Sequence, residues 1–201
     1  TLPYSGAIFI QTFPRECTET FLEGHRQAFE YFGGVPKRIS YDNSSIAVIK
    51  VLKGRERKLT KAFLRLQSSY LFQEHFCLVR RPNEKGHVER LLGYARRNFL
   101  VPVPEVASLV ALNETLDERC HADLAYRTRG KSGTKGELLI EDQAAFLHAH
   151  AAPPVFVNEG SCAVGRRDEV LLDPLSPPHD DVTPGIAWPQ LRPIHIVPFH
   201  Q

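Results

Sequence analysis

The sequence predicts an α/β protein, because segments with the pattern of strands alternate with segments that have the pattern of helices. Residues 7–13 are rich in β-forming side chains, and residues 18–32 carry apolar side chains at the three- and four-residue spacing of a helix. A second strand is predicted at 37–43. The order strand, helix, strand is typical of a βαβ unit, in which the two strands are parallel.

The helix at 18–32 has signals at both of its ends. Thr18 or Thr20 is suited to cap its N-terminus, and the pair Gly33-Gly34 is suited to end it. A single apolar face follows from the spacing, and we expect that face to be buried. Its members are Phe21, Leu22, His25, Ala28, Phe29 and Phe32.

The alternation continues through the middle of the chain. We predict an extended segment at 46–52, then a basic loop at 53–58. An amphipathic helix marked by Leu59, Phe63, Leu66 and Tyr70 follows, and after it a strand at 72–79. Three further helices are predicted: one that contains Glu89, and two at 105–123 and 137–150 that are joined by a basic loop at 126–136. Nine of the 15 prolines lie in 153–201, where apolar periodicity also fails. We expect this tail to be irregular and the least ordered part of the chain.

Glu89 is the first candidate for chemistry. It follows a turn that contains Pro82 and Gly86, and it stands near the start of a helix, off the apolar face. That face is formed by Val88, Leu91, Leu92, Ala95 and Phe99. A carboxylate at a rigid helix start beside a flexible glycine suits a metal ligand. The alternative is a solvated glutamate that the helix dipole favours.

Asp42 is the second candidate, because it ends the predicted strand at 37–43. Ligand sites in open α/β sheets form at the carboxyl ends of strands. Asp42 brought against Glu89 would supply two carboxylates for hard divalent cations, and we expect the two carboxylates to lie within about 8 Å of each other. The alternative is an Asp42-Asn43 turn, since both side chains bond to their own backbone.

The two acids resemble the second and third acids of the DDE motif of retroviral-type integrases and transposases. The match includes Pro82, Gly86, Val88 and Glu89 of a Pro-x-x-x-Gly-x-Val-Glu pattern. The chain is most similar to IstA-type insertion-sequence transposases, through residues 2–13, 21–43, 83–89 and 94–100. The resemblance covers roughly residues 1 to 150 and implies a ribonuclease H-like integrase core, a mixed sheet flanked by helices.

The resemblance also implies a mechanism, which is metal-dependent DNA strand transfer. Two Mg²⁺ or Mn²⁺ ions would be held in the complete site, with Asp42 and Glu89 as catalytic metal ligands. Asn43 would orient Asp42 or touch the substrate. Other residues would contact DNA phosphates: Lys85, His87, Arg90, Arg96 and Arg97. Transposon ends and target DNA, a helper AAA+ ATPase and a homo-oligomer are the implied partners.

One departure from the family pattern leads to further expectations. The first acid of the motif belongs to a strand upstream of residues 2–5, and Glu16, Glu19 and Glu23 do not match its setting. We therefore expect an N-terminally truncated fragment that is inactive alone, with a partial core at 1–104, a helical extension at 105–150 and a tail at 151–201. The alternatives are a non-catalytic DNA-binding or regulatory fragment and a ribonuclease H-like nuclease.

Charge is distributed unevenly along the chain. Net charge is +2 overall, but residues 37–66 hold nine Lys or Arg against two acids, a net of +7. This asymmetry indicates a polyanion such as DNA, although a solvated basic surface is the alternative. The proposed DNA-binding residues here are Lys53, Arg55, Arg57 and Lys58. Four isolated cysteines, no secretory signal and no membrane-length apolar run predict a cytoplasmic protein without a membrane partner.

Overall fold

The computed structural model describes residues 1–41, 45–54, 56–77, 93–102, 104–147 and 197–198. Its centre is a three-stranded sheet in the order β4-β1-β5. β1 (Arg38–Tyr41) pairs in parallel with β4 (Gln73–Phe76) and antiparallel with β5 (Val197–Pro198). β2 (Val48–Val51) and β3 (Arg57–Leu59) form a separate antiparallel hairpin. The α/β class is confirmed.

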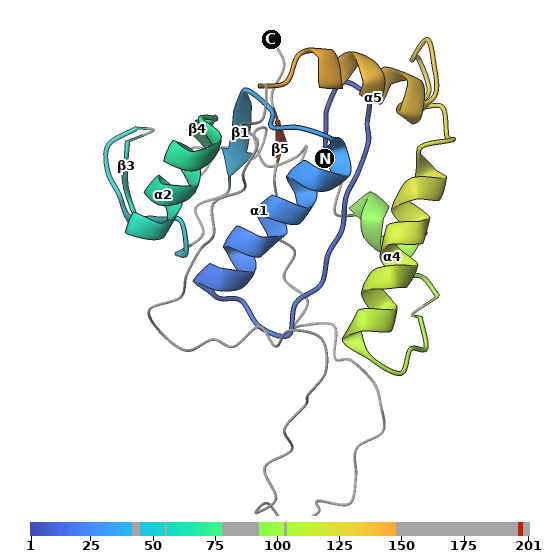
Figure 1. The fold of residues 1–201 in the computed structure, drawn as a ribbon, viewed down its shortest axis with the longest axis horizontal. Coiled ribbons are helices and arrows are strands. Elements are labelled where there is room, and N and C mark those ends of the chain that lie inside the picture. Colours follow the sequence, from blue (N-terminus) through green and yellow to red (C-terminus); the bar gives the residue numbers. More distant parts are fainter. Residues whose placement is uncertain (42–44, 55, 78–92, 103, 148–196, 199–201) are drawn as a thin grey trace, which may run out of the picture.

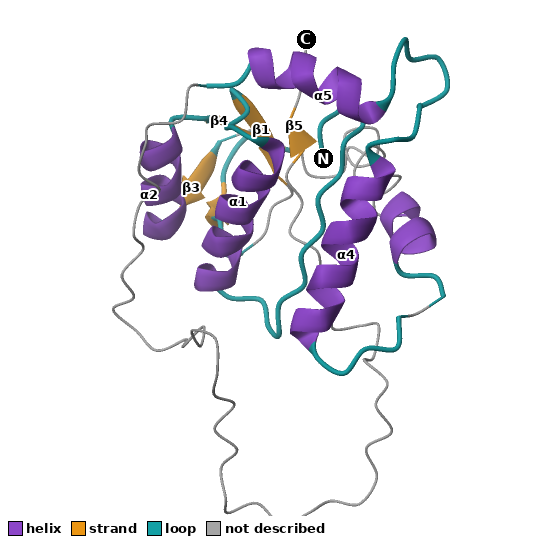
Figure 2. Cartoon of the chain, turned by 45° about the vertical axis from the view of Figure 1, so that its right-hand side comes forward, coloured by secondary structure: helices purple, strands orange, loops and turns teal. Residues whose placement is uncertain are grey.

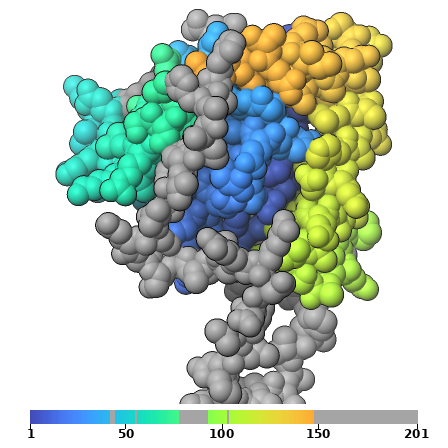
Figure 3. Space-filling view, in the orientation of Figure 1, coloured from blue at the N-terminus to red at the C-terminus, as the bar shows by residue number. Residues whose placement is uncertain are grey.

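Helices surround these strands. They are α1 (Thr18–Phe32), α2 (Lys61–Tyr70), α4 (Leu109–Asp123), α5 (Lys135–Ala144) and a helical segment at residues 93–99, called helix 93–99 below. In Figures 1 and 2, α1 lies between α2 on one side and α4 on the other, and α5 crosses one end. Figure 3 shows part of α1 at the surface of this face, between the regions of α2 and α4. No helix in the part of the chain that is described has the length and apolarity that crossing a bilayer requires.

α1 agrees closely with its prediction. Every side chain of the predicted face is buried, and Gly33 ends the helix in the left-handed conformation with a φ of +73°. The N-cap differs, because Cys17 occupies that position. Thr20 then serves as the third helical residue, and its hydroxyl accepts a hydrogen bond from the backbone N–H of Cys17 at 3.1 Å.

The parallel strand pair is not the one that the sequence predicts. β1 pairs with β4, and the connection between them includes the β2–β3 hairpin and α2. The prediction that residues 7–13 form the parallel partner of the strand at 37–43 is wrong for the described residues, where 7–13 form no strand. A parallel pair needs a long crossover, and the residues between β1 and β4 provide one.

Residues 7–13 are instead an extended segment that separates two hydrophobic clusters. Ala7 and Phe9 belong to the cluster beneath α1, whereas Ile8 and Ile10 belong to the cluster beneath α4. The backbone of Thr12 is hydrogen-bonded to the side chain of Asn113. Asn113 Oδ1 accepts from Thr12 N at 2.9 Å, and Asn113 Nδ2 donates to Thr12 O at 3.0 Å. Successive side chains of this segment therefore pack alternately into two different hydrophobic clusters, and this produces the alternating pattern that predicts a strand.

Several predicted boundaries need correction. α4 begins at Leu109 and not at 105, because Ser108 is its N-cap and accepts from Ala111 N at 3.1 Å. α5 begins at Lys135 and ends at Ala144. It stops short of the predicted 150 because Leu147 N donates to Val35 O at 2.8 Å and turns the chain toward the sheet. β3 begins at Arg57, within the predicted loop at 53–58, and it includes Leu59, which the sequence assigns to the following helix. That helix begins instead at Lys61, after the N-cap Thr60.

The predicted division into 1–104, 105–150 and 151–201 stays a prediction. Both hydrophobic clusters draw on residues from either side of position 104. Leu112 of α4 packs with Phe99, and Leu139 of α5 belongs to the same cluster as Val35. The tail at 148–196, with His148, His150 and most of the prolines, lies outside the described residues.

Candidate functional site at the carboxyl edge of the sheet

The two parallel strands end side by side. Tyr41 of β1 stands opposite Phe76 of β4, and Cys77 N donates to Tyr41 O at 3.0 Å just beyond the last pair. The chain thus leaves both strands at one edge of the sheet, which is where α/β sheets place ligand sites. Residue 42 follows β1 directly, and the segment containing Glu89 follows β4.

Both predicted acids lie outside the described residues. Seven predicted site residues, including these two acids, belong to the undescribed part of the chain: Asp42, Asn43, Arg55, Lys85, His87, Glu89 and Arg90. The expected separation of about 8 Å between the two carboxylates therefore stays a prediction. Among the residues that are described, no group of three or more His, Cys, Asp or Glu is arranged to hold a metal ion.

A packed polar pair lies beneath the end of β1. His25 Nδ1 is 2.7 Å from Phe21 O, and His25 Nε2 is 3.0 Å from Tyr41 Oη. A carbonyl can only accept, so Nδ1 carries the proton and Nε2 of the neutral ring accepts from the Tyr41 hydroxyl. Burial lowers the pKa of His25 to about 4, against a smaller opposite effect of the Phe21 carbonyl, and burial raises the pKa of Tyr41.

Aromatic rings enclose this pair. Phe63 meets Tyr41 nearly edge-on with ring centres 5.0 Å apart, and the Phe76 ring centre is 5.6 Å from that of Tyr41. Tyr41 is 3% exposed. The residue that precedes Asp42 is therefore held by neighbouring aromatic rings and at its hydroxyl, which gives the strand end a rigid support.

Arg57 has a structural role in addition to its positive charge, because its guanidinium is hydrogen-bonded to backbone carbonyls. Its guanidinium donates to Cys77 O at 3.0 Å and to the backbone carbonyls of Gly54 and Glu56 at 2.9 and 2.8 Å. The first of these bonds attaches the β2–β3 hairpin to the end of β4. Arg57 therefore fixes the hairpin at the carboxyl edge of the sheet.

The lysines of the hairpin face solvent. Lys53 and Lys58 are exposed, and Lys58 stands directly opposite Lys50, which is also exposed. Like charges at directly opposed strand positions are unfavourable, so a polyanion bound here would relieve their repulsion. The sequence analysis counts Lys50 in the basic segment 37–66 but does not name it as a DNA-binding residue, because only strand register brings it beside Lys58.

Helix 93–99 presents opposite faces to solvent and to the core. Arg96 and Arg97 are exposed, whereas Ala95 and Phe99 are buried. The two arginines are thus free of the core, as phosphate contacts require. The apolar face predicted for this helix is confirmed in its described part, through Ala95 and Phe99.

A buried ion pair anchors the same helix, and the sequence offers no signal for it. Lys135 Nζ lies 2.6 Å from Asp123 Oδ2, and the Tyr94 hydroxyl donates to Asp123 Oδ1 at 2.5 Å. Lys135 also donates to the Tyr94 oxygen at 3.3 Å. Burial, followed by the bond to Asp123, raises the pKa of Tyr94. The network joins helix 93–99 to α4 and α5.

Comparison with known proteins finds relatives that are all named as transposases. A transposase from Aminobacter aminovorans is 36% identical over 149 residues, which are 74% of this chain and 29% of the relative. A transposase for insertion sequences IS1326/IS1353 from Pseudomonas aeruginosa is 36% identical over 121 residues, 60% of this chain and 24% of the relative. A transposase for insertion sequence element IS21 from the same organism is 33% identical over 118 residues, 59% and 30% respectively. No family model matches, and the chain spans less than a third of each of these relatives.

Proposed function

We propose that this chain, which its sequence places with the IstA-type insertion-sequence transposases, forms part of the catalytic core that cuts and joins DNA during transposition. The observation that carries the proposal is the common carboxyl edge of β1 and β4. Asp42 follows the first strand, and the segment with Glu89 follows the second. A ribonuclease H-like arrangement of the core belongs to the same proposal, and the parallel β1–β4 pair supports it.

Asp42 and Glu89 would hold Mg²⁺ or Mn²⁺ in this scheme. The donor chemistry fits, because carboxylate oxygens are the ligands that hard divalent cations prefer. Bound ions would activate water and then a 3′-hydroxyl for in-line attack on phosphodiesters. The described residues give the site a rigid support: His25 and the surrounding rings fix Tyr41, and Arg57 holds Cys77 at the neighbouring strand end.

DNA would be held by the exposed cations of the β2–β3 hairpin and of helix 93–99. Lys53 and Lys58 belong to the hairpin that Arg57 attaches to β4, and Arg96 and Arg97 belong to the helix that follows the Glu89 segment. Contacts of this kind position the DNA backbone without reading base sequence. The AAA+ ATPase partner and the homo-oligomer are also part of the proposal.

Binding of Mn²⁺ to the whole chain, measured by electron paramagnetic resonance, tests the ligands. Asp42→Asn and Glu89→Gln should each weaken the affinity by roughly tenfold or more, since even residues behind the ligands contribute that much. Glu84→Gln is the matched control, because it neutralises a carboxylate of the same segment. If both Asp42→Asn and Glu89→Gln bind Mn²⁺ as the parent does, the metal-site proposal is wrong.

The products made from a labelled insertion-end duplex separate the alternatives. Joined products in the presence of Mg²⁺ or Mn²⁺ support strand transfer, either by the chain alone or by a longer protein that contains it. Cleavage without joining indicates a nuclease of the same fold. Binding of the duplex without any metal-dependent reaction, in both proteins, indicates a non-catalytic DNA-binding piece.

A further inference from the structure

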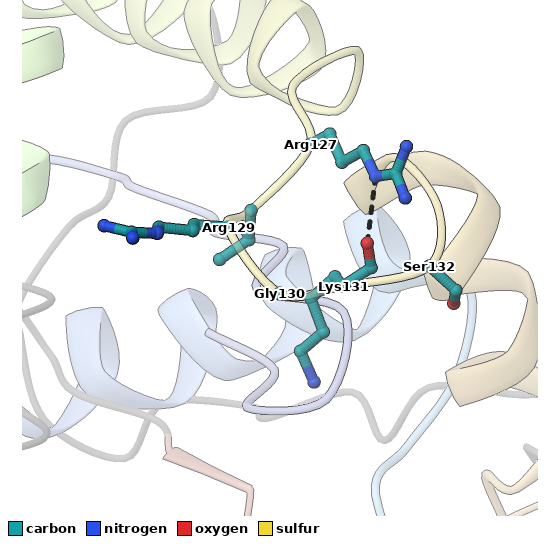
Figure 4. Close-up of a pocket in the computed structure, with 6 residues that line it drawn as sticks. Arg127, Arg129, Gly130, Lys131 and Ser132 are labelled. Carbon is teal, nitrogen blue, oxygen red and sulfur yellow. Dashed lines mark hydrogen bonds between the residues drawn. The ribbon is translucent and has the colours of Figure 1, made fainter.

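The connection between α4 and α5, residues 125–134, is a second concentration of positive charge. This α4–α5 loop carries Arg127, Arg129 and Lys131 and contains no acidic residue. Arg127 and Arg129 are exposed, and Lys131 is half-buried. The loop surrounds an open hollow that is lined by residues 127–132 (Figure 4). The loop lies outside the 37–66 segment and outside the residues assigned to DNA so far.

Backbone and side-chain hydrogen bonds hold the loop in one shape. Lys135 N donates to Tyr126 O at 2.8 Å and closes the loop at its base. Within the loop, Lys131 N donates to Thr128 O at 3.0 Å, and Arg127 Nε donates to Lys131 O at 2.9 Å. A surface that is ordered before binding loses less conformational entropy when a ligand binds to it.

The cationic side chains diverge from one another. In Figure 4, Arg127 and Arg129 extend in opposite directions from the loop, and Lys131 points away from both. The Lys131 ammonium is 4.9 Å from the centre of the Tyr4 ring. Side chains that spread apart do not close on one small anion. They suit an extended polyanion, whose successive phosphates lie several ångströms apart.

Arg129 is the most available of these cations. Within the described residues its side chain makes neither an ion pair nor a hydrogen bond, and it is exposed. Arg127 keeps its terminal guanidinium nitrogens out of the loop, since only its Nε donates to Lys131 O. Thr128 and Ser132 are exposed residues of the same loop. Arginine and serine or threonine side chains are typical contacts to phosphate oxygens.

The base of the loop is joined to a helix that already belongs to the proposed DNA surface. Lys135 directly follows the loop, and its buried pair with Asp123 also holds Tyr94 of helix 93–99. Arg96 and Arg97 are exposed on that helix. Cations from two separate segments are therefore fixed relative to one another.

We propose that the α4–α5 loop is a DNA-backbone contact that is separate from the β2–β3 hairpin and carries no base specificity. The inference rests on the proposed function, because it assumes that the chain acts on DNA. An acidic protein surface is the rival occupant. Duplex DNA fits better because Arg127 and Arg129 diverge, whereas recognition of carboxylates favours guanidinium groups that close on one partner.

Salt dependence of duplex binding, measured by fluorescence anisotropy on the whole chain, tests the proposal. Each phosphate contact contributes close to one unit to the slope of log affinity against log salt. Arg129→Ala should reduce the slope by about 1 and Arg127→Ala/Arg129→Ala by about 2, equally for unrelated DNA sequences. Circular dichroism at 222 nm and thermal melting confirm that the variants are folded.

Val110→Glu is the matched control for Arg129→Ala. It changes the net charge by the same amount at an exposed position near the start of α4, about 20 Å along the helix from the loop. The control should leave the slope unchanged. Arg129→Lys keeps the charge and should keep most of the slope, whereas a role in folding alone would not distinguish Lys from Ala by salt dependence.

The possible results separate this inference from the function on which it rests. If the parent binds duplex DNA and the loop variants keep its slope, the loop is not a contact and the proposed function stands. If the parent does not bind duplex DNA at 50 mM salt, both proposals fail. If the variants lose binding to poly-glutamate and keep binding to DNA, the loop receives an acidic protein instead, and the inference is wrong.

Discussion

At the scale of single residues, the pair His25–Tyr41 is the clearest link between stability and the proposed site. His25 is fully buried and is held in one tautomer by the Phe21 carbonyl, so its second nitrogen can only accept from Tyr41. Tyr41 ends β1, one position before Asp42. The interior histidine therefore contributes to the position of the strand end.

The buried histidine predicts a loss of stability in mild acid. Its pKa is about 4 in the folded chain, below the ordinary value of 6.5, so the unfolded chain binds a proton first as the pH falls. Stability from this group is complete above pH 6.5 and is lost between pH 6.5 and pH 4. We expect the free energy of unfolding to fall by about 2 kcal/mol from this group between pH 7.5 and pH 5, measured by urea denaturation.

A double variant isolates the histidine's share. His25→Leu/Tyr41→Phe removes the titrating ring and the hydroxyl that would otherwise be left unsatisfied. Its stability should change less between pH 7.5 and pH 5 than that of the parent. Equal pH dependence in the double variant and the parent would show that His25 is not the cause.

At the scale of elements, three helices depend on one buried network. Tyr94, Asp123 and Lys135 come from helix 93–99, α4 and α5, and each interacts with the other two. The Asp123 and Lys135 side chains are 3% and 8% exposed. A charge so far from water is tolerated only with its partner, so the network specifies how the three helices pack.

Asp123→Asn should be strongly destabilising, because it leaves the Lys135 ammonium buried without its counter-charge. We expect a loss of about 3 kcal/mol or more in urea denaturation. Asp117→Asn is the control: it makes the same change on α4 in an exposed pair with His121, and should cost less than about 1 kcal/mol. Adding Lys135→Met to Asp123→Asn should restore part of the stability. A small loss in Asp123→Asn would mean that water reaches this network.

At the scale of the whole molecule, exposed positive charge in the described residues gathers on two surfaces in addition to Arg96 and Arg97 of helix 93–99. One is the β2–β3 hairpin, where Lys50 and Lys58 oppose each other and Lys53 is exposed in the connecting turn. The other is the α4–α5 loop with Arg127 and Arg129. With a net charge of only +2 for the chain, this clustering favours local contacts to a polyanion over general attraction.

Two variants of the hairpin should separate the electrostatic role of its cations from their structural role. Lys53→Ala/Lys58→Ala should reduce the slope of log affinity for DNA against log salt by about 2. The unfolding free energy should stay the same or rise slightly, because the repulsion between Lys50 and Lys58 is removed. Arg57→Ala should in addition lower the unfolding free energy by about 1–2 kcal/mol, because the Cys77 carbonyl loses its donor. An unchanged salt slope in the lysine variant would show that the hairpin is only a solvated basic surface.

Much of the local structure was determined by the sequence alone. Spacing and end signals predict α1 with its complete buried face, and they predict α2 and β4 close to their observed bounds. Such features depend on neighbours within a few residues along the chain, so a single sequence contains them. The candidate acids Asp42 and Glu89 also come from the sequence, and their proximity stays a prediction.

Only the tertiary structure decided which segments became partners. Residues 7–13 have the alternation of a strand, yet their neighbours are α1 and α4, and Asn113 supplies hydrogen bonds to Thr12. The Lys135–Asp123 pair likewise forms across a loop that has no periodic pattern. Partner choice depends on how long-range packing satisfies buried backbone and charged groups, and that sum over the whole chain is not visible in any local pattern.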